Sequence, residues 1–322
     1  MQHLPHDHAR LTRGAVDLHV HGQPDLSRAL ENRGDDLATA RLAVEYGMRA
    51  WVLKSHVWPT TDRAAAIQRA FDPEEFQVFG SITLNPPAGG LSPASVDLAA
   101  AHGARMVFLP TWSAAADVAR HGYISQLLEG IIGHFTEFST GSALSVLDGA
   151  GRLTADVRSI ISICRDNDMT IGTGHVSLRE SLAIARHCAE RGVRLVVNHP
   201  LHYAESVAEL RELADLGAFI EFSAGPLLHP EATSSVRDVH AAITGLGTGQ
   251  VVLTSDAFSR WAPAQPEALR IMLEQLAYLG STADEIATMA VQNPGRAIGI
   301  AAAEPAARAE LPHSPAARPP EP

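Results

Sequence analysis

The chain has 322 residues, of which 46% are hydrophobic and 19% are charged, so it can bury one large core or two small ones. Its formal net charge of -11 argues against nucleic acid and anionic membranes as partners and favours a small-molecule substrate. No stretch approaches the ~20 consecutive apolar residues that span a bilayer, and the start of the chain lacks the apolar core of a signal peptide, so we expect a cytoplasmic protein.

The two ends of the chain differ in composition from the rest. We expect residues 1–14 to form an N-terminal tail, in which His3, His6 and His8 lack the fixed geometry of a metal site. Residues 301–322 are rich in Ala, Pro and Glu and have few large apolar side chains, so we expect them to be disordered. Cys164 and Cys188 fall in expected amphipathic helices, which is typical of reduced core residues in a reducing compartment.

The first expected strand, residues 16–21, carries a His-x-His pair and ends at Gly22 and Pro24. Strict alternation would place Asp17, His19 and His21 on one face of this strand and its apolar residues on the other. Two neutral imidazoles that leave one strand end together can hold a divalent metal ion, and burying them without one leaves polar atoms unsatisfied. The pattern therefore predicts a metal site at this strand end.

Strands and helices then alternate along the chain. The second strand is followed by Lys54 and His56, which share a face. Gly47 stands where a left-handed residue would end the first helix. The expected elements are helix 35–46, strand 50–53, helix 59–68, strand 76–84, helix 93–101, strand 104–109, helix 155–167, strand 169–173, helix 178–190, strand 195–197, helix 204–216, strand 218–222, helix 233–244 and strand 250–253.

The alternation of strands and helices is interrupted between residues 113 and 153. We expect a helical segment at 123–132 and a hairpin turn at Asp148-Gly149 in this stretch. Long connections in compact folds are usually functional, so we interpret it as an insertion that forms a lid or a subunit contact, which leaves room for a homo-oligomer.

Residues 15–300 thus contain eight strands that alternate with helices, which predicts a (β/α)8 TIM barrel. Such a barrel gathers the C-terminal ends of its strands on one face, where active sites form. Four histidines and one aspartate fall at these expected ends. They are His19, His21, His175, His199 and Asp256.

These positions resemble the amidohydrolase superfamily, whose metal site takes His-x-His from strand 1, single histidines from strands 5 and 6, and an aspartate from strand 8. The matching segments are Asp17-Leu18-His19-Val20-His21, Gly174-His175, Asn198-His199-Pro200 and Thr254-Ser255-Asp256. Asn293-Pro294-Gly295-Arg296-Ala297-Ile298-Gly299 also looks like the segment that closes such barrels. The resemblance implies a hydrolase of an amide, cyclic amide, lactone or related bond. It also implies one or two divalent ions, zinc above all, or manganese or iron.

The sequence differs from the superfamily pattern at the end of strand 4. Many members with two metal ions carry a lysine or glutamate there, and this chain has Phe108-Leu109-Pro110-Thr111. Lys54 is the nearest substitute, either carboxylated and bridging two ions or an ammonium that holds an anionic substrate. His56 is a ligand or a substrate contact, and Asp256 could take the proton of the attacking water and pass it to the leaving group. Other polar candidates near the mouth are Asp25, His202, His229 and Glu221.

Three other functions remain open. The first is a metal-dependent decarboxylase on the same barrel. The second is a phosphoesterase of the polymerase-and-histidinol-phosphatase type, although Ser255-Asp256-Ala257-Phe258 lacks the final histidine of its motif. The third is a barrel that binds metal or ligand without turnover.

Overall fold

The computed structural model describes residues 9–28, 35–135, 143–230, 232–259 and 262–300. His3, His6, His8 and the C-terminal segment 301–322 lie outside the described residues. Residues 9–14, which we expected in the N-terminal tail, pack against the barrel. Leu11 and Thr12 are buried there, and the Thr12 hydroxyl donates to the carbonyl oxygen of Tyr46 at 2.6 Å.

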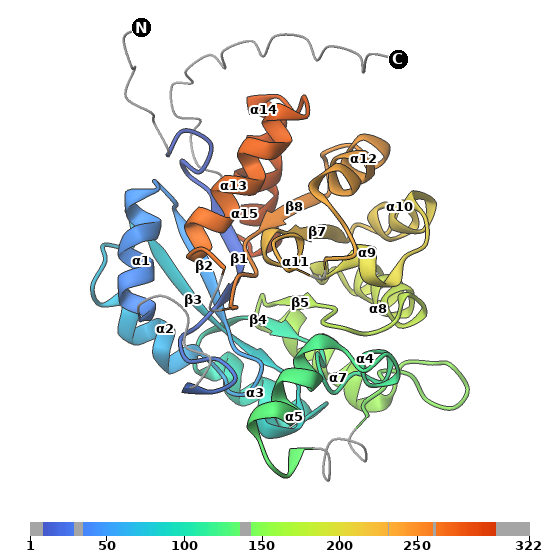
Figure 1. Ribbon diagram of the computed structural model, residues 1–322. Coiled ribbons are helices and arrows are strands. Elements are labelled where there is room, and N and C mark those ends of the chain that lie inside the picture. Colours follow the sequence, from blue (N-terminus) through green and yellow to red (C-terminus); the bar gives the residue numbers. More distant parts are fainter. Residues whose placement is uncertain (1–8, 29–34, 136–142, 231, 260–261, 301–322) are drawn as a thin grey trace, which may run out of the picture.

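Eight parallel strands form a single sheet in which each strand neighbours the next one along the chain. Backbone contacts bring its two edges together, because the Asp256 N–H, just after the last strand, donates to the His19 carbonyl on the first at 3.0 Å. The predicted barrel is therefore confirmed, with helices around it (Figure 1). The strands are β1 Val16–His21, β2 Ala50–Lys54, β3 Gln77–Thr83, β4 Ala104–Phe108, β5 Thr170–Gly172, β6 Leu195–Val197, β7 Phe219–Ser223 and β8 Val251–Thr254.

Side-chain caps decide where several helices begin. The helix expected at 204–216 starts later because Ser206 accepts from the Glu209 N–H and Glu209 reaches back to the Ser206 N–H. Ser177 and Ser235 start two other helices in the same way. The main helices are α1 Asp36–Glu45, α2 Thr61–Gln68, α3 Pro93–Ala101, α4 Ala115–Ala119, α5 Tyr123–Ile131, α7 Ala155–Asp166, α8 Leu178–Arg191, α10 Val207–Asp215, α12 Val236–Leu246 and α13 Gln265–Tyr278. Short elements are η2 Pro86–Ala88, α9 Pro200–Tyr203, α11 Ala224–Leu227, α14 Ala283–Ala287, η3 Thr288–Gln292 and α15 Asn293–Ala297.

The first strand does not alternate strictly, contrary to our expectation. Its pairing with β2 shifts register between Asp17 and Val20. As a result, Val16 and Leu18 belong to the apolar cluster inside the barrel, whereas Val20 belongs to the larger core between strands and helices. The irregularity lets the strand fill the barrel with apolar side chains low down and still present His19 and His21 at its upper end.

The floor of the barrel consists of apolar side chains from alternate strand positions, including Val52, Met106 and Phe108. The C-terminal segment closes it from below. Ala297 and Ile298 join this cluster, and the Asn293 amide donates to the carbonyl oxygens of Thr248 and Val251, both at 2.7 Å. The expected closing role of residues 293–299 is thus borne out by these contacts.

The connection between β4 and α7 holds the helix and the turn that we predicted. Helix α5 covers the expected segment, and an antiparallel bridge joins Leu147 to Leu153 around the turn at Asp148. Helix α4 comes before α5 and was not expected. The role of this connection as a lid or subunit contact stays a prediction.

Among the described helices, none combines the length and the apolar character needed to cross a membrane.

One glycine tests how tightly the top of the barrel is packed. Gly174, just before His175, has φ +61°, and a Cβ there would lie 2.3 Å from the Leu109 carbonyl oxygen. Gly103 also has positive φ (+84°), but its Cβ would meet nothing within 4 Å.

We expect Gly103→Ala to lower the free energy of unfolding by about 1 kcal/mol, because of backbone strain. Gly174→Ala should cost about 3 kcal/mol because the carbonyl must also move. Urea unfolding measures both, and equal losses would contradict this packing.

Candidate metal centre

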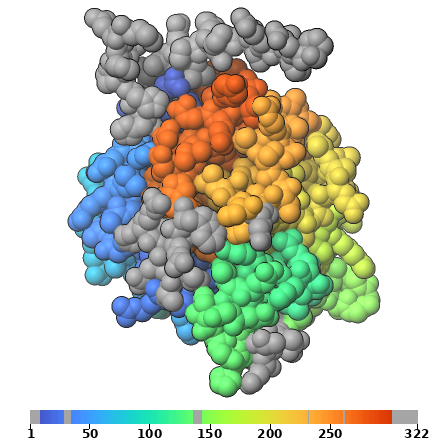
Figure 2. Space-filling model, viewed as in Figure 1, coloured from blue at the N-terminus to red at the C-terminus, as the bar shows by residue number. Residues whose placement is uncertain are grey.

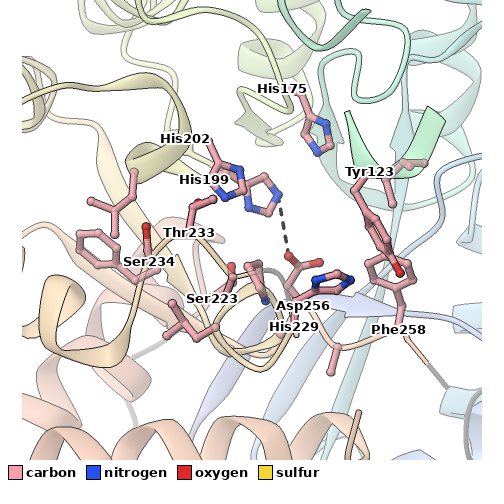
Figure 3. A pocket seen from close by; sticks show the side chains of 18 of the residues that line it. Tyr123, His175, His199, His202, Ser223, His229, Thr233, Ser234, Asp256 and Phe258 are labelled. Atoms are coloured by element: carbon pink, nitrogen blue, oxygen red, sulfur yellow. Dashed lines mark ion pairs between the residues drawn. The ribbon is translucent and has the colours of Figure 1, made fainter. Parts of the chain in front are cut away.

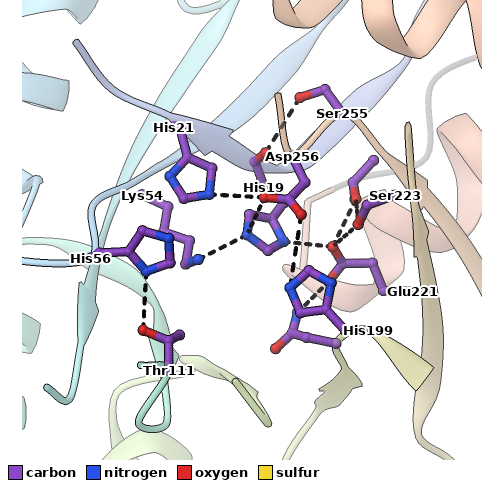
Figure 4. A network of polar contacts seen from close by, with 12 residues as sticks. His19, His21, Lys54, His56, Thr111, His199, Glu221, Ser223, Ser255 and Asp256 are labelled. Carbon is purple, nitrogen blue, oxygen red and sulfur yellow. Dashed lines mark hydrogen bonds and ion pairs between the residues drawn. The ribbon is translucent and has the colours of Figure 1, made fainter. Parts of the chain in front are cut away.

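The two histidines of β1 are oriented by carboxylates. His19 Nδ1 lies 2.6 Å from Glu221 Oε1, and His21 Nδ1 lies 2.5 Å from Asp25 Oδ2. Both rings are almost fully buried. A carboxylate on Nδ1 keeps the proton on that nitrogen and leaves the Nε2 lone pair available, as in histidines that bind metals. Both Nε2 atoms face the same point (Figure 4).

Asp256 occupies that point. Its Oδ1 is 2.9 Å from His21 Nε2 and 3.2 Å from His19 Nε2, so these three side chains form a group that could hold a metal ion. The backbone of Asp256 is left-handed, with φ 44°, directly after β8. Burial alone would raise the pKa of Asp256, but His19 and His21, when they are protonated, hold it well below its usual range.

Lys54 reaches the same point from the end of β2. Its Nζ is 2.9 Å from His19 Nε2 and stands over the Phe108 ring, 5.2 Å from the centroid. Phe108 ends β4, so an aromatic ring lies where the resemblance to the amidohydrolase superfamily would lead us to expect a lysine or glutamate. Burial lowers the pKa of Lys54, and the nearby Asp256, Asp25 and Glu221 oppose that shift. Lys54 thus lies beside the ligand group, although it comes from a different strand.

His199 and His175 lie farther out. His199 Nε2 is 3.8 Å from Asp256 Oδ2, and its ring centroid is 5.5 Å from that of His19. His175 packs its ring 5.0 Å from His199, but its Nδ1 faces Asp117 Oδ1 at 3.3 Å. The structure therefore gathers His19, His21 and Asp256 tightly, with His199 at their edge and His175 on the pocket wall.

Four further residues were left open by the sequence. Glu221 points into the barrel, fully buried, and Asp25 supports His21. His202 stacks on His199 at 5.6 Å, and burial together with Arg120 lowers the pKa of His202 to about 4. His229 lies on the pocket wall with its ring 4.6 Å from that of Tyr123. All four thus border the site or the pocket above it.

His56 belongs to a separate hydrogen-bonded group. Its Nδ1 lies 3.0 Å from the Thr111 hydroxyl, and its backbone N–H donates to Asp25 Oδ1 at 2.7 Å. Thr111 in turn contacts the side chain of Asn85, which follows β3. Burial, and then the positive charge of Lys54, lower the pKa of His56 well below its usual range. His56 is therefore neutral at physiological pH.

A pocket of about 250 Å³ opens above these groups (Figure 3). His56, His175, His199 and Asp256 line its base. Its walls carry apolar side chains from α5 and from the loops after β6, β7 and β8. They include Tyr123, Ile124, Leu201, Pro226, Leu227 and Phe258. Figure 2 shows the green segment of α4 and α5 against the yellow and orange segments on one face of the molecule, in agreement with the contact between Tyr123 and His229.

The charges of this centre suit a divalent cation. The carboxylates of Asp25, Glu221 and Asp256 all have lowered pKa values, in each case because nearby histidines outweigh the effect of burial. Lys54 is the one basic side chain that faces them among the described residues. When the two imidazoles give up the proton on Nε2 to a cation, the three carboxylates and the Lys54 ammonium leave an excess of two negative charges, which fits one divalent ion bound by imidazole and carboxylate.

Sequence reasoning missed three residues that support the site. Asn85 and Thr111 hold His56, and Asp117, on α4, faces His175. Asn85 stands just after β3 and Thr111 shortly after β4, so a search of every strand end for polar residues of any kind would have found them. Asp117 lies in the long connection, where no periodic pattern marks it.

Comparison with solved structures defines the class of fold. An amidohydrolase from Pseudomonas aeruginosa matches with a TM-score of 0.58 over 90% of this chain and 97% of its own, at 12% identity. An organophosphorus hydrolase from Deinococcus radiodurans gives 0.54, over 90% and 94%, at 17% identity. A 2,6-dihydroxybenzoate decarboxylase also gives 0.54, over 89% and 100%, at 11% identity. The expected resemblance to amidohydrolase structures is thus confirmed at the level of the fold.

Sequence comparison places the chain more narrowly. It belongs to a family of unknown function, DUF6282, whose match covers residues 14–221. That match begins before β1 and ends within β7, so it includes the His-x-His pair, Lys54, His56 and Glu221. No curated protein matches the sequence.

Metal analysis would test the ligand group. We expect His19→Ala to lose bound zinc after dialysis against the ion, because it removes a central nitrogen. Glu221→Gln should weaken zinc affinity by roughly 10–100-fold, since the amide no longer fixes the proton on His19 Nδ1. The control is Glu212→Gln, on the exposed surface of α10. Zinc affinity unchanged in Glu221→Gln would contradict the assignment.

Proposed function

We propose that the protein is a metal-dependent hydrolase of the amidohydrolase type that acts on a small molecule. The observation that carries this proposal is the convergence of His19 Nε2 and His21 Nε2 on Asp256 Oδ1, with a carboxylate behind each ring. The fold shared with amidohydrolases and an organophosphorus hydrolase supports it. The bond we propose is an amide, cyclic amide, lactone or related bond.

The residues that would hold the ion are His19, His21 and Asp256, with His199 and His175 as further candidates. Imidazole and carboxylate ligands favour zinc, with manganese or iron as alternatives. Such an ion supplies a water of lowered pKa and a Lewis acid for the scissile bond. Whether one or two ions bind depends on Lys54.

Asp256 is the group best placed to move a proton. Its Oδ1 faces the two Nε2 atoms and its Oδ2 faces His199, at the base of the pocket. An ionised carboxylate there can accept a proton from the attacking water and return it to the leaving group.

Lys54 supplies a positive charge at the same place. As an ammonium it has no lone pair to donate to a metal, and its Nζ and a metal ion would compete for the same lone pair on His19 Nε2. We therefore propose that Lys54 turns to an anionic group of the substrate, in preference to forming a carboxylated bridge. This assignment also favours a second candidate function. A metal-dependent decarboxylase would use a cation that holds the carboxylate of its substrate, and the fold is shared with a 2,6-dihydroxybenzoate decarboxylase.

We place the enzyme in the cytoplasm, working on a small molecule and not on nucleic acid or membranes. Buried Cys164 and Cys188 are free, and burial raises the pKa of the Cys188 thiol to about 12, so neither is suited to redox chemistry. The surface of α4 and α5 is the part of the chain we propose for a homo-oligomer contact.

Turnover should depend on Asp256. In a panel of amide, lactone and ester substrates, we expect Asp256→Asn to keep the fold but to lower kcat by about 10²–10⁴-fold, because the amide cannot accept the proton. Asp62→Asn, at an exposed position on α2, is the matched control. Parent turnover in Asp256→Asn, with zinc content also unchanged, would rule out the proton-transfer role.

The two states of Lys54 predict opposite results. If Lys54 is an ammonium, Lys54→Met should retain zinc and raise KM for an anionic substrate by roughly 10-fold or more, as expected for a lost charged hydrogen bond. If it is a carboxylated bridge, the variant should lose one ion per chain, and added short carboxylates should restore part of it. Zinc content per chain, measured with the intact mass of the parent protein, distinguishes the two.

A further inference from the structure

The side-chain amide of Asn85 has only one orientation that satisfies its neighbours. Its Oδ1 accepts from the backbone N–H of Thr111 at 3.0 Å and from the Ser113 hydroxyl at 2.7 Å. Its Nδ2 donates to the backbone carbonyl of His56 at 2.9 Å and to Thr111 Oγ1 at 2.7 Å. Rotating the amide by 180° would set its NH2 group against a backbone N–H and its oxygen against a carbonyl.

The orientation of Asn85 decides the role of the Thr111 hydroxyl. Because Thr111 Oγ1 accepts from Asn85, its own hydrogen needs an acceptor in this buried place. His56 Nδ1, at 3.0 Å, is the one other polar atom that bonds to it among the described residues. The Thr111 hydroxyl therefore donates to His56 Nδ1.

It follows that neutral His56 carries its proton on Nε2. His56 lines the pocket, and the carboxylate oxygen nearest to its Nε2, Asp25 Oδ2, is 4.0 Å away, too far for a hydrogen bond. The backbone of His56 is held on both sides, by Asp25 and by Asn85. The ring is thus fixed with Nδ1 on Thr111, which leaves Nε2 as its free donor (Figure 4).

We propose that His56 donates a hydrogen bond from Nε2 to a negatively charged oxygen of the substrate, with Thr111 and Asn85 as positioning residues that fix its tautomer. The donor role rests on the proposed function, whereas the tautomer does not.

The proton on His56 Nε2 also argues against a second metal site. His21, Asp25 and His56 offer ligand atoms within 4.8 Å of one another, but a nitrogen that bears a proton cannot bind an ion. The substrate class is therefore an acid, or an amide or ester whose carbonyl oxygen gains charge.

The tautomer is measurable by nitrogen-15 NMR of the full chain labelled at histidine. The His56 signals are identified by their loss in His56→Gln. We expect the proton on Nε2 in the parent and in Thr111→Ser, which keeps the hydroxyl. We expect a mixture of tautomers in Thr111→Val, which is close in shape but has no hydroxyl. A parent protein with the proton on Nδ1, or with His56 Nε2 bound to zinc on titration, would overturn the proposal.

The donor role is tested with acetate as a carboxylate probe on the zinc-loaded protein. We expect acetate to bind about 5-fold more weakly to His56→Phe, equivalent to one ordinary hydrogen bond. His56→Gln retains a donor and should stay within about 2-fold of the parent, with its zinc content unchanged. Equal acetate affinity in His56→Phe and the parent would overturn the donor role. If the parent protein binds no zinc, the proposed function fails. The tautomer measurement still decides whether His56 carries its proton on Nε2.

Discussion

The orientation of His19 in the candidate ligand group depends on one buried carboxylate, that of Glu221. It contacts His19 on β1, Asn198 after β6, Thr254 on β8 and Ser223 on its own strand. Burial of a charged carboxylate costs several kcal/mol unless its oxygens are satisfied, and here donors from consecutive parts of the barrel satisfy them. The same contacts hold three strand ends and the loop after β6 in one arrangement. The orientation of His19 is thus a property of the closed barrel and not of β1 alone.

Most of the fold could be predicted from the sequence because most strands are short apolar runs and several helices begin at a side-chain cap. Errors occurred where contacts from other elements set the details. The register shift in β1 arises from pairing with β2, and the direction of Glu221, which the sequence left open, depends on what lies across the barrel. Neither effect leaves a local pattern.

The candidate site was predictable to the extent that its residues have distinctive chemistry. His19, His21 and Asp256 stood out because imidazoles and carboxylates at strand ends are unusual, and the structure brings them together. Asn85 and Thr111 did not stand out, because amides and hydroxyls are common at turns and their role appears only when their partners are known. Lys54 was expected at the site from its position at a strand end, but its contact with His19 could be located only once β1 and β2 were paired.

Two hydrogen-bonded groups, one around Glu221 and one around Asn85, hold the histidines of the site, and they share few side chains. Donors to Glu221 come from β1, β8 and the loop after β6, whereas the group that holds His56 comes from the loops after β3 and β4. A lineage could therefore exchange residues around Asn85 and Thr111 and alter which molecules are accepted without disturbing the contact between Glu221 and His19. Such independence would let relatives diverge in chemistry while they keep the orientation of His19.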